Sequence, residues 1–300
     1  MLNQFLKTRH RGNSSTTIRV REFVERLCKR HIELGLADQD FENRLCNGSD
    51  AEYWQRLSEA LLAGELLNAG LDLRPSRDGP DLLLMHEGRK IWIEVICPEP
   101  RDIPDDWLSY EPSQEFSSVS FPHEEILLRW TAAIKEKAEK LLGNPEKNIL
   151  GYLKKDVVSP DDSYVIAVNG RMLRSTLGDL FGISQLPFAV EAVFAVGPNK
   201  LVIDRASSQV IDITHQHRPI LPKHNVPCVP ADTFQDPTFK AVSAIWATDI
   251  DDCWVVGHPK NMLVVHNPIA FNPTPERLLP ATSEYVASDC KEGEYLLSRR

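Results

Sequence analysis

The sequence lacks the features that mark membrane, secreted and nucleotide-binding proteins. No stretch approaches the roughly 20 consecutive apolar residues that a membrane-spanning helix needs, so we expect no membrane partner. Residues 1–10 contain no apolar segment long enough for a secretory signal, and we therefore expect a cytoplasmic protein. The 15 glycines are scattered and form no phosphate-binding loop of the Walker or dinucleotide type.

Cysteine and positive charge are also scarce. The six cysteines lie far apart without a Cys-x-x-Cys pair, which favours reduced thiols over a disulfide framework. Lys and Arg number 34 against 43 Asp and Glu, and the net charge of −9 argues against broad coating of nucleic acid. Residues 1–31 are an exception, with eight basic residues against two acids. This segment is either a solvated helix face with a basic tail or a phosphate-contacting arm.

The rest of the composition is typical of a globular α/β protein. Apolar residues make up 42% and charged residues 26% of the 300 residues, which is enough for one large or two small domains. Helical spacing predicts helices over residues 17–36, 50–69 and 122–143, with a mobile lead-in at 1–15 and a loop or broken helix at 37–50. Apolar runs predict strands over residues 164–169, 190–196, 200–204, 210–215, 242–248, 253–256 and 262–266. We expect the later strands to extend one sheet or to form hairpins at its margin, without beginning a separate fold.

Residues 78–98 are the most informative stretch and predict two strands joined by a tight turn. If Glu87 and Gly88 are the central turn residues, Asp81 lies opposite Glu94, with Cβ atoms roughly 4.5–5.5 Å apart. Two carboxylates at that distance repel each other unless one is protonated or a cation lies between them. A hard divalent cation with oxygen ligands would satisfy this arrangement.

Pro80-Asp81, a spacer of twelve residues and then Glu94 resemble the Pro-Asp…(Asp/Glu)-x-Lys signature of the PD-(D/E)XK nuclease superfamily. The preceding acidic helix and the following Lys-bearing amphipathic helix fit this signature as well. The longer pattern over residues 79–100 is similar to uncharacterised bacterial proteins placed in that superfamily. The resemblance covers roughly residues 50–170.

The resemblance implies a restriction-endonuclease-like α/β core, with a mixed central sheet flanked by helices and β-rich C-terminal additions. We expect a basic helical segment at residues 1–48, a nuclease-like core at 49–200, and a β-rich extension at 201–300 packed on the core. Residues 98–122, rich in Pro, Asp and Ser, are a candidate lid beside the site.

The resemblance also implies Mg²⁺- or Mn²⁺-dependent hydrolysis of nucleic acid, DNA rather than RNA, in restriction, phage defence or repair. Asp81, Glu94 and the Val95 carbonyl are the expected metal ligands. Glu59, near the middle of the preceding helix, is either a third ligand or a surface acid. Many nucleases that cut both strands work as pairs, so a homodimer is one option. We expect Asp81→Asn or Glu94→Gln to abolish cleavage and to leave stability unchanged or raised.

The chain departs from the family signature at the lysine position, which holds Ile96. An aliphatic side chain there cannot stabilise developing charge. Three interpretations stay open. The lysine function lies on the following helix, with Lys137 first and Lys135 second; or Lys90 supplies it; or the site is degenerate, and the protein is a nucleic-acid- or protein-binding module.

Histidine and cysteine residues give a third hypothesis, a zinc-dependent hydrolase. His215 and His217 would point to one side of a strand, and His224 and Cys228 follow them, but the spacing matches no closed zinc site. Cys253, His258 and His266 form a weaker group.

Overall fold

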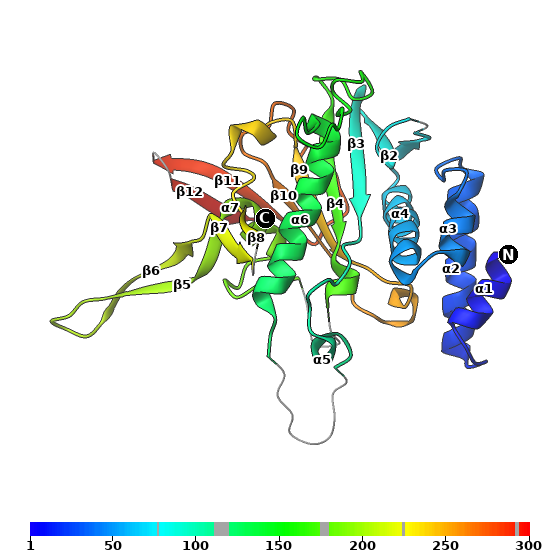
Figure 1. The fold of residues 1–300 in the computed structure, drawn as a ribbon, viewed down its shortest axis with the longest axis horizontal. Helices are drawn as coiled ribbons and strands as arrows, with labels where there is room; N and C mark the ends of the chain where they lie inside the picture. Colours follow the sequence, from blue (N-terminus) through cyan, green and yellow to red (C-terminus); the bar gives the residue numbers. More distant parts are fainter. Residues whose placement is uncertain (77, 111–119, 175–179, 224–225, 292–293) are drawn as a thin grey trace.

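The computed structural model describes the chain except for residues 77, 111–119, 175–179, 224–225 and 292–293 (Figure 1). Its α-helices are α1 (Leu2–Arg9), α2 (Ser15–Glu33), α3 (Phe41–Asn47), α4 (Asp50–Asn68), α5 (Asp105–Leu108), α6 (His123–Leu142) and α7 (Phe188–Phe194). Short 3₁₀ helices are η1 (Gly170–Leu173), η2 (Pro237–Phe239) and η3 (Trp254–Val256). The strands are β1 (Asp72–Arg74), β2 (Leu82–His86), β3 (Arg89–Ile96), β4 (Ser163–Asn169), β5 (Val196–Ile203), β6 (Val210–His217), β7 (Ile220–Lys223), β8 (Val226–Pro230), β9 (Ala244–Asp249), β10 (Asn261–His266), β11 (Ser283–Lys291) and β12 (Glu294–Arg299).

A mixed eight-stranded sheet forms the centre of the protein, in the order β1-β2-β3-β4-β9-β10-β11-β12. Strand β4 lies between β3 and β9 and is parallel to both, whereas β2 and β3 form an antiparallel hairpin. The predicted extension of the sheet by later strands is confirmed for β9 and β10, because β9 pairs directly with β4 and β10 with β9. Strands β5 and β6 instead form a separate two-stranded sheet, which is the hairpin alternative. The protein is therefore a mixed α/β protein with a large central sheet flanked by helices (Figure 1).

Alternating residues of the central strands pack on opposite faces of the sheet, as the two-residue period of a strand requires. In β4, Val165 and Ala167 belong to the hydrophobic cluster that contains the apolar residues of α2 and α4, whereas Ile166 and Val168 belong to the cluster of α6 and α7. All seven residues of β4 are buried. The continuous apolar run at 164–169 therefore reflects a strand covered on both faces, as predicted.

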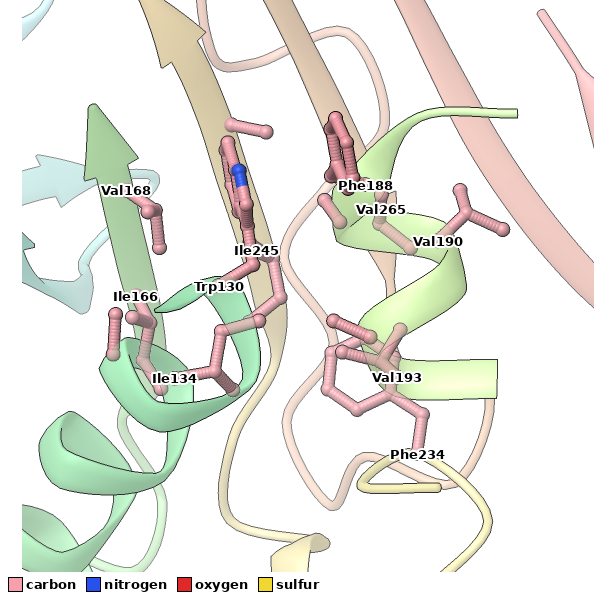
Figure 2. Packing of buried hydrophobic residues seen from close by; sticks show 14 of the residues in the cluster. Trp130, Ile134, Ile166, Val168, Phe188, Val190, Val193, Phe234, Ile245 and Val265 are labelled. Atoms are coloured by element: carbon pink, nitrogen blue, oxygen red, sulfur yellow. The ribbon is translucent and has the colours of Figure 1, made fainter. Parts of the chain in front are cut away.

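Apolar side chains of α6 and α7 belong to one hydrophobic cluster over one face of this sheet. Figure 2 shows Ile134 of α6 beside Ile166 and Trp130 of α6 beside Ile245, while Val193 of α7 lies close to Phe234. Burying large apolar side chains of this kind contributes about 1.5–3 kcal/mol each. Because α6 is fixed by this packing, the residues on its side facing β3 have defined positions.

The predicted helix over 50–69 is confirmed as α4, and its start is encoded locally. The hydroxyl oxygen of Ser49 accepts from the Glu52 amide, and the Glu52 carboxylate accepts in turn from the Ser49 amide. This capping box provides hydrogen-bond acceptors for two backbone amides at the start of the helix, which have no acceptor within the helix itself. The helix over 122–143 is likewise confirmed as α6, and the helix over 17–36 as α2.

Three local predictions are wrong. Residues 190–194 belong to helix α7 rather than to a strand, and all seven residues of α7 are buried. A continuous apolar run fits a strand or a helix buried on all sides, so periodicity alone could not separate them. Residues 253–256 are largely the 3₁₀ helix η3. The expected mobile lead-in contains helix α1, in which Leu2 and Leu6 are buried.

Strands β5 and β6 form a two-stranded ribbon that extends from the body of the protein (Figure 1). All eight residues of β6 are exposed. Across the described residues, no helix has both the length and the apolar character needed to cross a bilayer.

Candidate active site

The site lies where β3 continues past its partner β2. The observed register pairs Leu82 with Ile93 and His86 with Arg89, which confirms Glu87-Gly88 as the turn. Continuing this register by one residue brings Asp81 opposite Glu94, as predicted. Beyond that position β2 offers β3 no further partner.

Side chains replace the missing strand at this edge. The Val95 amide donates to Asp81 Oδ2 at 2.7 Å. Gln55 of α4 donates from Nε2 to the Val95 carbonyl at 3.1 Å and accepts at Oε1 from the Cys97 amide at 2.9 Å. The Gln55 amide thus bonds the edge as a neighbouring strand would, and it attaches α4 to the end of β3. Nothing in the sequence pattern indicated this role for Gln55.

Strand alternation turns Glu94 toward α6, on the same face as Trp92 and Ile96. Lys137 Nζ lies 2.9 Å and Lys140 Nζ 2.7 Å from Glu94 Oε1. The side chains of Glu94 and Lys137 are 1% and 6% exposed, whereas that of Lys140 is 43% exposed. The second oxygen of Glu94, Oε2, is buried without a hydrogen-bond partner among the described residues.

These ion pairs correct one premise of the sequence argument. A bound cation is not the sole source of charge compensation, because Lys137 and Lys140 bring two positive charges to Glu94. Ile96 packs in the hydrophobic cluster under α6, so an ammonium group comes from the helix and not from the strand position.

Glu59 is buried on α4, where it accepts from Gln55 Nε2 and from Arg56 Nη1, both at 2.9 Å. Burial and the negative charge of Asp81 raise the pKa of Glu59 to about 8. Burial and the charge of Glu94 raise the pKa of Asp81 to about 6. The three carboxyl groups therefore influence one another, although Glu59 comes from a different element.

A cavity of about 350 Å³ opens at this end of the sheet. It is lined by residues of α4, the hairpin, the segment after β3 and α6, among them Gln55, Arg56, Glu59, Asp81, Ile96, Glu99, Arg101, Arg129, Glu136, Lys137 and Lys140. Within the described part of the chain, Asp81 has no ion-pair partner, and its bond to the Val95 amide is the one hydrogen bond it accepts. The cavity therefore places a carboxylate without a cationic partner close to two lysines.

The other lysine candidates lie elsewhere. Lys135 does not line the cavity, and burial, partly offset by the charges of Asp232 and Asp236, lowers its pKa. Lys90 pairs with Met85 next to the turn, at the far end of the hairpin from Glu94. The structure thus brings together Asp81, Glu94, Lys137 and Glu59, and leaves out Lys135 and Lys90.

Sequence reasoning missed Tyr152 and the pairing of Lys140. Burial and the negative charges of Glu94 and Asp81 raise the pKa of Tyr152, so its phenol lies within the electrostatic reach of both acids. Of the candidate lid, Asp105–Leu108 is a short helix in which Trp107 is buried, and residues 111–119 lie outside the described residues.

The histidines separate into different surroundings. His215 and His217 lie on the exposed strand β6, and His224 lies outside the described residues. His266 bonds Glu284 at 3.2 Å. His258 and Cys253 come close to the buried Asp251, with ligand atoms within 4.8 Å of one another. However, the Asp251 carboxylate also contacts Arg174 at 2.7 Å and Arg171 at 3.3 Å, which already compensate its charge.

Comparisons with protein-family models, with curated proteins and with solved structures gave no match.

Proposed function

We propose that this protein is a nuclease that hydrolyses phosphodiesters with Mg²⁺ or Mn²⁺, on a restriction-endonuclease-like core. One observation carries the proposal: Asp81, Glu94 and Glu59 converge with Lys137 at the open end of β3, beside a cavity. These are the four residues that the resemblance to the PD-(D/E)XK superfamily selects.

The donor set suits a hard divalent cation. Asp81 has no ion pair, and the buried Glu94 Oε2 accepts no hydrogen bond, within the described residues. The Val95 carbonyl accepts one hydrogen bond from Gln55 and retains a second lone pair. Asp81, Glu94 and Val95 would hold the cation, with Glu59 as a further or water-mediated ligand. A bound cation of this kind activates water and neutralises phosphate charge.

The protein residues supply the remaining requirements. Lys137 holds its ammonium group beside Glu94, where it can stabilise negative charge that develops on a phosphate oxygen. Ile96 cannot do so. Burial and the negative charge of Asp81 raise the pKa of Glu59, whereas the Arg56 guanidinium beside it lowers that pKa, as an arriving cation would also do. Gln55 fixes the end of β3 and therefore the Asp81–Val95 contact.

A second candidate is a binding module that keeps this scaffold without cleavage. The observation that favours it is the pairing of Glu94 with both Lys137 and Lys140, since a carboxylate compensated twice is a poorer metal ligand. Ile96 at the usual lysine position supports the same interpretation.

Cleavage assays with labelled DNA and RNA, single- and double-stranded, test the proposal. We expect cleavage that requires Mg²⁺ or Mn²⁺ and that favours DNA. Asp81→Asn should lower the cleavage rate at least about 100-fold. Mutating a residue that only supports a metal ligand already lowers metal affinity or activity 10–100-fold. Asp72→Asn is the matched control, because Asp72 lies on β1 and pairs with Arg74. Binding without cleavage at any divalent ion concentration would establish the second candidate instead.

A further inference from the structure

Helix α6 presents a row of side chains to the cavity at helical spacing. Arg129, Ala133, Lys137 and Lys140 all line it, at intervals of four, four and three residues. Residues so spaced lie along one side of a helix. The small Ala133 lies between Arg129 and Lys137, and Glu136 of the same helix also lines the cavity.

The cations of this cavity differ in how they are compensated. Lys137 and Lys140 both bond Glu94, Arg56 bonds Glu59 at 2.9 Å, and Arg101 bonds Glu99 at 3.0 Å. Arg129 has no ion pair with any described residue, and its Nε is buried without a hydrogen-bond partner. A half-buried guanidinium with an unused donor is costly unless an anion reaches it.

A second guanidinium lies nearby. Burial and then the positive charge of Arg101 lower the pKa of Arg129, although Asp102, Glu99 and Glu136 act in the opposite direction. Like charges repel, and an anion bound by both guanidinium groups would relieve that repulsion. The planar fork of arginine matches the oxygens of a phosphate group, to which it donates two parallel hydrogen bonds.

We propose that Arg129 anchors a phosphate group of the nucleic-acid backbone, on the same strand as the phosphate that lies beside Lys137. The identity of this ligand rests on the proposed function. Arg129 and Lys137 are eight residues apart, which is about 12 Å along the helix axis. The two side chains therefore contact different phosphates of one strand, with Ala133 between them. A single small anion would not require both positions.

Binding measurements in a non-cleaving background test this inference. Fluorescent single-stranded DNA is titrated with Asp81→Asn protein, and with the same protein carrying Arg129→Gln, over a range of salt concentrations. The loss of one phosphate contact should weaken binding and reduce the slope of log K against log salt by about 0.7. Arg129→Lys should restore most of the slope, because it keeps the charge.

Lys29→Gln is the matched control, since it removes one positive charge from α2, where Lys29 pairs with Glu25. We expect it to leave the slope unchanged. Equal affinity and slope with and without Arg129→Gln, or no binding of DNA at all, would overturn the inference. Cleavage by the wild type is assayed separately. A wild type that does not cut, together with a slope that depends on Arg129, would refute the nuclease proposal and leave the phosphate site standing.

Discussion

Lys137 Nζ lies 2.9 Å from Glu94 Oε1, and both side chains are almost completely buried. This pair joins the central strand β3 to helix α6 in the protein interior. It changes what the sequence alone implied for Glu94, since the carboxylate opposite Asp81 now also compensates a buried ammonium group. Its removal therefore affects the fold as well as the site.

We predict that Glu94→Gln lowers the free energy of unfolding by about 3–5 kcal/mol, because it leaves the buried Lys137 without its counter-charge. This reverses the expectation that removing the acid leaves stability unchanged or raised. Urea unfolding followed by circular dichroism measures the change. Asp81→Asn, which breaks no ion pair, is the comparison and should not lower the free energy of unfolding.

A double-mutant cycle separates the ion pair from other effects of the substitution. The variant Glu94→Gln with Lys137→Met should be less destabilised than the sum of the two single variants, because neither charge is then left alone. Simple additivity of the two losses would show that the pair contributes nothing to the fold.

The stability of the metal-free protein should depend on pH through Asp81. Its pKa is raised from 3.8 to about 6, so the folded protein binds more protons than the unfolded chain in this range. The stability contributed by this carboxyl is fully present below about pH 4 and is lost as the pH rises through about 6. Asp81→Asn should therefore gain stability relative to the wild type as the pH rises from 4 to 7, by up to about 3 kcal/mol.

The stabilisation of the protein by added Mg²⁺ should increase as the pH rises, because carboxyl groups must lose their protons to bind a cation. We expect Mg²⁺ to raise the melting temperature of the wild type more at pH 8 than at pH 5. In Asp81→Asn the shift should be small at both values. Equal shifts for the two proteins would place any Mg²⁺ site away from Asp81.

The sequence predicted the centre of the site because local signals determine it. The Glu87-Gly88 turn sets the hairpin register, and the register alone places Asp81 opposite Glu94. The spacing of apolar residues in α6 places Lys135, Lys137 and Lys140 on or beside its buried side, and the resemblance permits a lysine of this helix to replace the one missing at Ile96. Short-range rules are reliable in such cases because neighbouring residues decide the structure.

What the sequence did not reveal depends on contacts between distant segments. Gln55 lies 40 positions from Val95, and a glutamine in a helix gives no signal that it will bond a strand edge. The prediction of a strand over residues 190–196 was wrong for a similar reason. Their apolar run fits a strand or a buried helix, and packing against α6 and Phe234 decides for α7.

Arg9 should stabilise the fold rather than bind nucleic acid, which addresses the open question about the basic N-terminal segment. Its guanidinium lies 3.5 Å from the centre of the Tyr53 ring, and Nη2 is 2.6 Å from Asp50 Oδ1. We expect Arg9→Ala to lower the free energy of unfolding by about 1–2 kcal/mol. Affinity for DNA, measured by fluorescence anisotropy, should not change. Weaker DNA binding with an unchanged melting temperature would identify Arg9 as part of a phosphate-contacting arm.

Gln55 should be the most sensitive neutral residue of the site. Gln55→Ala leaves the Val95 carbonyl and the Cys97 amide without their side-chain partner, at about 1–3 kcal/mol for each buried group. Gln235→Ala is the matched control, because Gln235 donates a single hydrogen bond to the Phe194 carbonyl and lies away from the cavity. In urea unfolding, we expect Gln55→Ala to lose about twice as much stability as Gln235→Ala.

Gln55→Glu distinguishes the loss of hydrogen bonds from a change in charge. The new carboxylate can accept from the Cys97 amide but cannot donate to Val95, and it adds negative charge beside Glu59. Because the pKa of Glu59 is raised to about 8, this repulsion grows as Glu59 ionises. Relative to the wild type, Gln55→Glu should therefore lose more stability at pH 8 than at pH 5. Gln55→Ala should lose a similar amount at both pH values. If both variants respond equally to pH, Gln55 acts through backbone bonding alone and not through the acidic cluster.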